Sequence, residues 1–147
     1  MKAKLFSYGF LLLLCLGTGC TSFHHEWRKA GRNLNSPQPL GGQWEGQWVS
    51  LNNGHSGKLK CVLGVSPDGK HFRAHFRATY AKYFHFSYVA ELTGVETGGN
   101  MKFTGESDLG KLAGGIYKYS GQANATNFAC TYESKYDHGT FQMSRSK

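Results

Sequence analysis

Basic and titratable side chains alternate with apolar ones along a short stretch near the middle of this chain. They are His71, Arg73, His75 and Arg77, and His85 follows shortly after them. In an extended strand every second side chain points to the same side. The pattern therefore predicts a basic, pH-sensitive face suited to an anionic partner such as a lipid headgroup or an acidic glycan. A plain solvated strand face is the alternative.

These histidines are not expected to bind a metal. His71 and His75 would stand about 13 Å apart on one strand, too far to share an ion. His75 and His85 could approach each other across a hairpin, but zinc takes three or four ligands and no third is evident. We expect no metal and no other cofactor.

Two turn-like segments hold the residue types of a hydrolase triad. His55 and Ser56 lie in the first segment, and Asp137 and His138 lie in the second. A hydroxyl, an imidazole and a carboxylate in mutual contact can activate a nucleophile. No nucleophile elbow accompanies them, and the Asn, Asp and Gly residues around them are typical of turns. We expect a non-catalytic rim at one end of the fold, with a rim hydrolase as the alternative.

Large apolar residues occupy every second position from Trp44 onward, which is the period of a strand and not of a helix. Eight strands are predicted, at about residues 43–51, 57–65, 70–80, 83–93, 100–106, 115–123, 127–134 and 139–145. Short connections favour antiparallel pairing of successive strands. Closure into an eight-stranded up-and-down β-barrel would remove exposed edges, and a flattened β-sandwich is the alternative.

The inward face of these strands is rich in aromatic rings. A barrel of this size either fills with side chains or holds one small ligand, and the number of rings favours a filled interior. Four tyrosines are candidates for lining a polar pocket end: Tyr88, Tyr117, Tyr119 and Tyr132. Cys61 and Cys130 point inward from well-separated strands, so we expect free, buried thiols.

The first strand carries the sequences Gly42-Gln43-Trp44 and Gly46-Gln47-Trp48. They resemble the Gly-x-Trp motif that opens the first strand of lipocalins and avidin-like proteins. The resemblance covers this strand and the number of strands. It implies a lipocalin-like (calycin-like) barrel with a tryptophan packed at one end and a lumen that binds a small apolar molecule.

The N-terminal segment predicts where the protein works. Lys2 and Lys4 precede an apolar run at residues 6–16, and small residues lead to Cys20. This order is that of a secretory signal peptide, and the run is shorter than the about 20 apolar residues that span a bilayer. The junction LGTGC resembles a bacterial lipoprotein signal, which implies cleavage before Cys20 and lipidation of its thiol. An ordinary signal cut after Gly19 is the alternative.

The predicted organisation is a signal peptide at 1–19, a lipidated N-terminus and tether at 20–41, and a barrel domain at 42–147. A short helix at residues 24–33 would have little apolar surface to bury. The net charge is +8, but secretion argues against nucleic acid and for anionic lipid or glycan. We expect a bacterial cell-envelope lipoprotein, in the outer membrane, that acts as a non-catalytic binding or structural module. A carrier of a small apolar ligand is the alternative.

Overall fold

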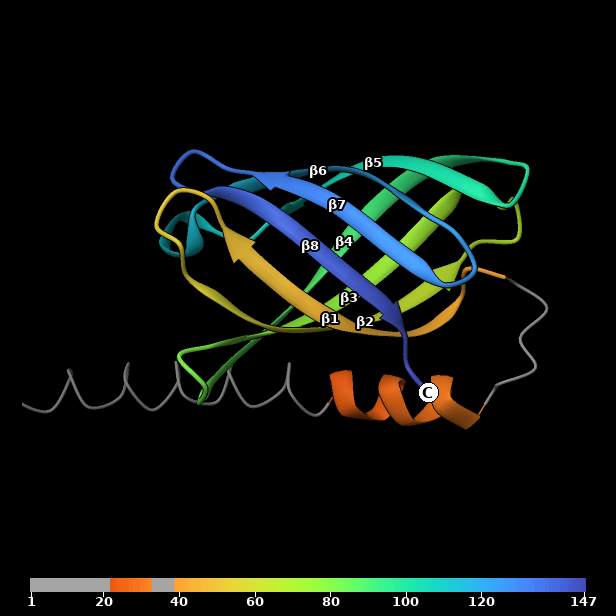
Figure 1. Cartoon of the computed structure of the whole chain (residues 1–147), viewed down its shortest axis with the longest axis horizontal. Helices are drawn as coiled ribbons and strands as arrows, with labels where there is room; N and C mark the ends of the chain where they lie inside the picture. Colours follow the sequence, from red (N-terminus) through yellow and green to blue (C-terminus); the bar gives the residue numbers. More distant parts are fainter. Residues whose placement is uncertain (1–21, 33–38) are drawn as a thin grey trace, which may run out of the picture.

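Eight antiparallel strands close into a barrel in the computed structural model, which describes residues 22–32 and 39–147 (Figure 1). The strands are β1 (Gly42–Ser50), β2 (Ser56–Val65), β3 (His71–Tyr80), β4 (Phe84–Thr97), β5 (Asn100–Asp108), β6 (Ile116–Ala123), β7 (Asn127–Glu133) and β8 (His138–Arg145). Each strand pairs with the next one along the chain, and β8 pairs with β1 to complete the ring. The predicted up-and-down barrel is confirmed, and the chain does not form the flattened sandwich.

The predicted strands agree closely with the observed ones, and the main difference is the length of β4. This strand continues to Thr97, past the predicted end at residue 93, because it pairs with β5 as far as Asn100. Gly98 and Gly99 form the two-residue turn between the strands, with φ of 61° and 80°. Such left-handed geometry at both turn positions suits the right-handed twist of a hairpin.

A layer of aromatic rings fills the middle of the barrel. Phe76 is fully buried, and its ring centroid lies 5.3 Å from that of Phe141 and 5.4 Å from that of Tyr88. Cys61 pairs with Phe76 across β2 and β3, and both Cys61 and Cys130 are buried free thiols. The expectation of unpaired inward cysteines is confirmed. Burial of each such ring contributes about 1.5–3 kcal/mol.

Trp44 closes one end of the barrel. Its side chain is fully buried, its indole N–H donates to the Leu40 carbonyl at 3.1 Å, and its ring centroid lies 6.0 Å from that of Phe128. The guanidinium of Arg145 lies 4.4 Å from the Trp44 ring centroid and donates to the carbonyls of Gly41 and Pro39. We call this the closed end.

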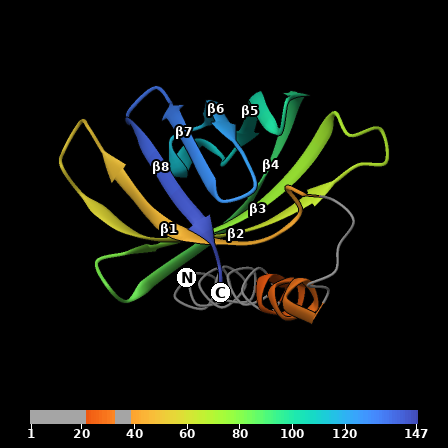
Figure 2. The ribbon, with the colours of Figure 1, turned by 45° about the vertical axis from the view of Figure 1, so that its right-hand side comes forward.

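A helix at residues 22–32 packs on the outside of the barrel, against β3 (Figure 2). Phe23 is 1% exposed, and its ring meets the edge of the His75 ring at 5.1 Å. Glu26 Oε2 accepts hydrogen bonds from Arg73 Nη1 and His75 Nδ1, both at 2.9 Å. Gln43 Nε2 donates to the Trp27 carbonyl at 2.7 Å, which ties the helix to β1.

The docked helix differs from the expectation of a helix with little to bury inside a tether at 20–41. The expectation overlooked Phe23, which lies one residue before the predicted helix start and is its main buried group. Burying Phe23 covers His75, which is 4% exposed and not part of an open strand face. The predicted signal peptide at 1–19 and Cys20 lie outside the described residues.

Candidate functional site

A cavity of about 580 Å³ occupies the end of the barrel opposite Trp44. We call this the open end. The cavity lies among the β3–β4, β5–β6 and β7–β8 connections, and most of its lining is apolar. Its lining residues are Trp48, Ala78, Tyr80, Phe86, Tyr88, Leu109, Leu112, Ala113, Tyr117, Tyr132, Asp137 and Phe141. The barrel is therefore filled only in part, because the aromatic layer around Phe76 forms the floor of a pocket above it.

Asp137 is the charged group in the wall of this pocket. Its Oδ1 accepts a hydrogen bond from Ser50 Oγ at 2.6 Å, and its Oδ2 accepts one from Tyr132 Oη at 3.0 Å. These bonds hold the half-buried carboxylate in place at the turn between β7 and β8. Burial and the neighbouring carboxylate both raise the pKa of Tyr132, so the phenol remains a donor at neutral pH.

Three of the four candidate lumen tyrosines line the pocket, namely Tyr88, Tyr117 and Tyr132. Tyr119 lies deeper, 3% exposed, with its hydroxyl 2.8 Å from Ser107 Oγ. Burial raises the pKa of Tyr119 to about 12 and that of Tyr88 well above its ordinary value. These hydroxyls therefore stay protonated at neutral pH.

The candidate triad residues do not form a triad. The His55 ring nitrogen Nδ1 lies 3.0 Å from Tyr80 Oη, while both oxygens of Asp137 bind Ser50 and Tyr132. His138 is exposed, and its carbonyl accepts from the Leu51 N–H at 2.8 Å. His55, Asp137 and His138 share the open end, as their turn positions predict, with separate partners.

The candidate basic face is largely engaged with its own chain. Arg73 and His75 bind Glu26, and Arg77 Nη1 is hydrogen bonded to His24 Nε2. Removal from solvent, and then the charge of Arg77, lower the pKa of His24, so its ring is an acceptor at neutral pH. The helix thus occupies the place expected for an external anionic partner.

The remaining two members of that face lie apart from each other. His71 Nδ1 bonds Asp68 Oδ2 at 2.6 Å at the closed end, and His85 Nδ1 lies 3.1 Å from Thr79 Oγ1. His75 pairs with Val89 and His85 with Thr79, so the idea that His75 and His85 meet across the hairpin is wrong. Within residues 22–32 and 39–147, no three His, Cys, Asp or Glu side chains gather in a metal-binding group.

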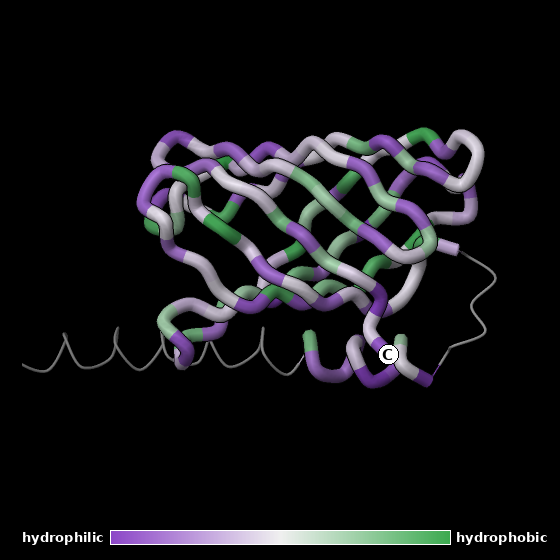
Figure 3. Tube along the Cα trace, in the orientation of Figure 1, coloured by the Kyte–Doolittle hydropathy of each residue, from purple (hydrophilic) through white to green (hydrophobic). Residues whose placement is uncertain are grey.

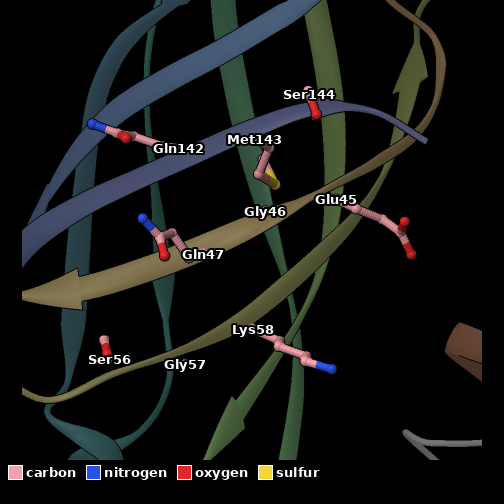
Figure 4. A pocket seen from close by; sticks show the side chains of 9 residues that line it. All are labelled: Glu45, Gly46, Gln47, Ser56, Gly57, Lys58, Gln142, Met143 and Ser144. Atoms are coloured by element: carbon pink, nitrogen blue, oxygen red, sulfur yellow. The ribbon is translucent and has the colours of Figure 1, made fainter. Parts of the chain in front are cut away.

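A second hollow lies on the outer wall of the barrel, over β8, β1 and β2 (Figure 4). Its volume is about 610 Å³, but it is a wide, open depression over the backbone of Gly46 and Gly57. The side chains of Glu45 and Lys58 extend to one side of the view and those of Gln47 and Gln142 to the other, so they do not converge on it (Figure 4). This hollow lacks the enclosure that a ligand site needs.

Sequence reasoning missed one feature of the open end, which is a set of exposed apolar side chains on its connections. These are Leu51, Tyr83, Phe84, Leu112 and Tyr136, and all are more than 60% exposed. Part of the signal was present in the sequence, since Leu51 and Tyr136 each lie in an otherwise polar turn. Large apolar groups gathered at one place on a surface mark an interaction site more often than a single exposed residue does.

The fold and the pocket define a closed β-barrel with one open, apolar end. No protein-family model matches the sequence, and no curated protein matches it significantly. No helix in the described part of the chain is long and apolar enough to cross a membrane.

Proposed function

We propose that this protein is a non-catalytic binding barrel of the bacterial cell envelope that takes a small apolar molecule into its open end. The observation that carries the proposal is the cavity of about 580 Å³ with a mostly aromatic lining. Ligand pockets typically have volumes of about 300–1,000 Å³. Of the two roles expected from the sequence, this geometry favours the ligand carrier over a purely structural module.

The wall of the pocket restricts the chemistry of the ligand. Flat or aliphatic groups fit between rings such as Trp48, Tyr88 and Phe141. Asp137 is a carboxylate that already accepts from Ser50 and Tyr132, and it repels an anionic group. The preferred ligand is therefore neutral, with a hydroxyl or amide donor on an apolar body.

The attachment to the envelope rests on the sequence. The leader and the LGTGC junction support lipidation of Cys20, so the barrel would be held at a membrane surface. Metabolic labelling with an alkyne fatty acid tests this in a bacterial host. We expect label on the wild-type chain and none on Cys20→Ala.

Ligand binding is tested with the neutral dye N-phenyl-1-naphthylamine, whose fluorescence rises in apolar surroundings. Ala78 lines the pocket, so Ala78→Phe places a ring in the space that the dye would occupy. Ala129 lies exposed on the outer side of β7, so Ala129→Phe is the matched control. We expect at least about a tenfold loss of affinity for the first variant, equivalent to about 1.4 kcal/mol, and none for the second.

Equal dye binding by the two variants would place the dye elsewhere and overturn the proposal. Native mass spectrometry of protein purified from its own host then identifies the natural ligand. A neutral apolar mass that is retained by the wild type and lost from Ala78→Phe is the expected result.

A further inference from the structure

The open end carries a ring of apolar side chains that nothing in the described chain covers. Leu112 is 103% exposed, Tyr83 is 82% exposed and Phe84 is 71% exposed. Leu112 lines the pocket, and Tyr83 and Phe84 lie on the β3–β4 hairpin, from which Tyr80 and Phe86 line it. In Figure 3 hydrophobic segments lie among hydrophilic ones in the loops at this end. Solvation of such groups in water is unfavourable, so their position calls for a partner.

In three of the four connections at the open end, a lysine stands directly before an exposed apolar residue. The pairs are Lys82-Tyr83, Lys111-Leu112 and Lys135-Tyr136, and all three lysines are exposed. Lys135 Nζ lies 5.2 Å from the centroid of the Tyr136 ring, so charge and ring are presented together. A long basic side chain beside an aromatic or aliphatic one suits the boundary between lipid headgroups and acyl chains.

The closed end provides an internal contrast. Its connections, at residues 66–70, 98–99 and 124–126, are made of Ser, Pro, Asp, Gly, Lys, Asn, Ala and Thr. None of the large exposed apolar side chains of the described residues lies in those three turns. The combination of exposed apolar groups with lysine is therefore a property of the open end and not of the barrel connections in general.

From these observations we infer that the open end is a docking surface for an anionic lipid bilayer. Tyr83, Phe84 and Leu112 enter the headgroup region, and Lys82, Lys111 and Lys135 pair with lipid phosphates. The exposed apolar and lysine side chains of the open end support bilayer docking whether or not the pocket binds a ligand.

The direction of the N-terminal helix agrees with this orientation. Residues 23 and 24 approach Arg77, Thr79 and His85 near the open half of β3 and β4, whereas Trp27 and Gly31 approach Gln43 near the closed end. The start of the helix thus points toward the open end (Figure 1). Cys20 lies two residues before Ser22, so a lipid on its thiol would be attached near the end of the helix that faces the proposed bilayer.

The test uses the chain that remains after leader removal, residues 20–147, with Cys20→Ser so that no acyl chain contributes. This piece keeps every described contact of the barrel and the helix. Binding is measured by co-sedimentation with vesicles of phosphatidylethanolamine and phosphatidylglycerol, and with vesicles of phosphatidylcholine alone. We expect binding to the anionic vesicles and little binding to the neutral ones.

Two matched sets of variants locate the surface. Lys82→Gln, Lys111→Gln and Lys135→Gln together remove three charges from the open end and should weaken binding about a hundredfold. The control removes the same charge from the closed end through Lys70→Gln, Lys102→Gln and Lys147→Gln. Equal loss in the two sets would show attraction by net charge alone and overturn the proposal.

The apolar contribution is tested separately. Tyr83→Ser with Leu112→Ser should weaken vesicle binding about tenfold, while Val95→Ser, an exposed apolar site in the other half of β4, should leave it unchanged. Circular dichroism and thermal melting check that each variant folds. No binding by the wild type, no effect of Tyr83→Ser with Leu112→Ser, or a stable dimer in solution that buries Leu112 would each overturn the inference.

Discussion

Replacing Phe23 with Ala should release the N-terminal helix from the barrel without unfolding the barrel. Phe23 is 1% exposed, and burial of a phenylalanine side chain contributes about 1.5–3 kcal/mol. An average loss of about 2 kcal/mol raises the equilibrium constant for undocking about 30-fold, because each 1.4 kcal/mol is a factor of ten. The barrel should keep its melting temperature, since its own interior does not contain Phe23.

Hydrogen–deuterium exchange read by mass spectrometry measures this release. Amides at residues 22–32 of Phe23→Ala should exchange about 30-fold faster than in the wild type, and those of β5 to β7 should be unchanged. His25→Ala, an exposed substitution on the same helix, is the matched control and should leave exchange unaltered. Unchanged exchange at residues 22–32, or a joint loss of protection in the helix and the barrel, would refute the claim that the helix undocks independently of barrel unfolding.

Three further predictions concern other parts of the molecule. Burial opposes ionisation of Glu26, but hydrogen bonds from His75 and Arg73 outweigh it and lower the pKa of this carboxyl below 4.5. Helix docking should therefore be complete above pH 4.5 and weaken as the pH falls through the lowered pKa. Hydrogen–deuterium exchange at residues 22–32 measures this. Burial raises the pKa of Cys130 to about 12 and that of Cys61 well above its ordinary value, so both thiols should resist dithionitrobenzoate near neutral pH until the protein unfolds. Gly46→Ala would place a Cβ 1.9 Å from the Gln142 carbonyl oxygen. Calorimetry should therefore show that the variant is destabilised by about 3 kcal/mol or more. An unchanged melting temperature would contradict the close approach of β1 and β8.

The barrel could be predicted from the sequence because alternation places one set of side chains inside. Phe76, Cys61 and Trp44 are all at inward positions of that pattern, and all are fully buried. The three-residue connection between β3 and β4 carries little turn signal, because residues 81–83 contain no glycine. In its turn, Ala81 and Lys82 have φ of 47° and 68°. This left-handed geometry usually occurs at glycine, so neither residue type predicts it.

The candidate site could be predicted only in part. Tyr88, Tyr117 and Tyr132 reach the pocket because they share the inward face, which periodicity reveals. The contact between Ser50 and Asp137 joins residues 87 positions apart and depends on closure of β8 against β1, so local pattern carries no trace of it. Local pattern also gives no sign of the contact between Glu26 and His75 of β3, since a helix can dock on any outer face of the barrel that offers it partners.

Because Trp44 fills the closed end, the barrel interior is accessible from the open end. With Leu40 and Arg145 packed over Trp44, the described residues leave no passage at the closed end, so a molecule that enters at the open end must also leave there. Under the proposed function, a bound molecule would be stored or presented at the open end and would not pass through the barrel. Exchange of a bound molecule should therefore respond to changes around Leu112 and remain indifferent to changes at residues 66–70.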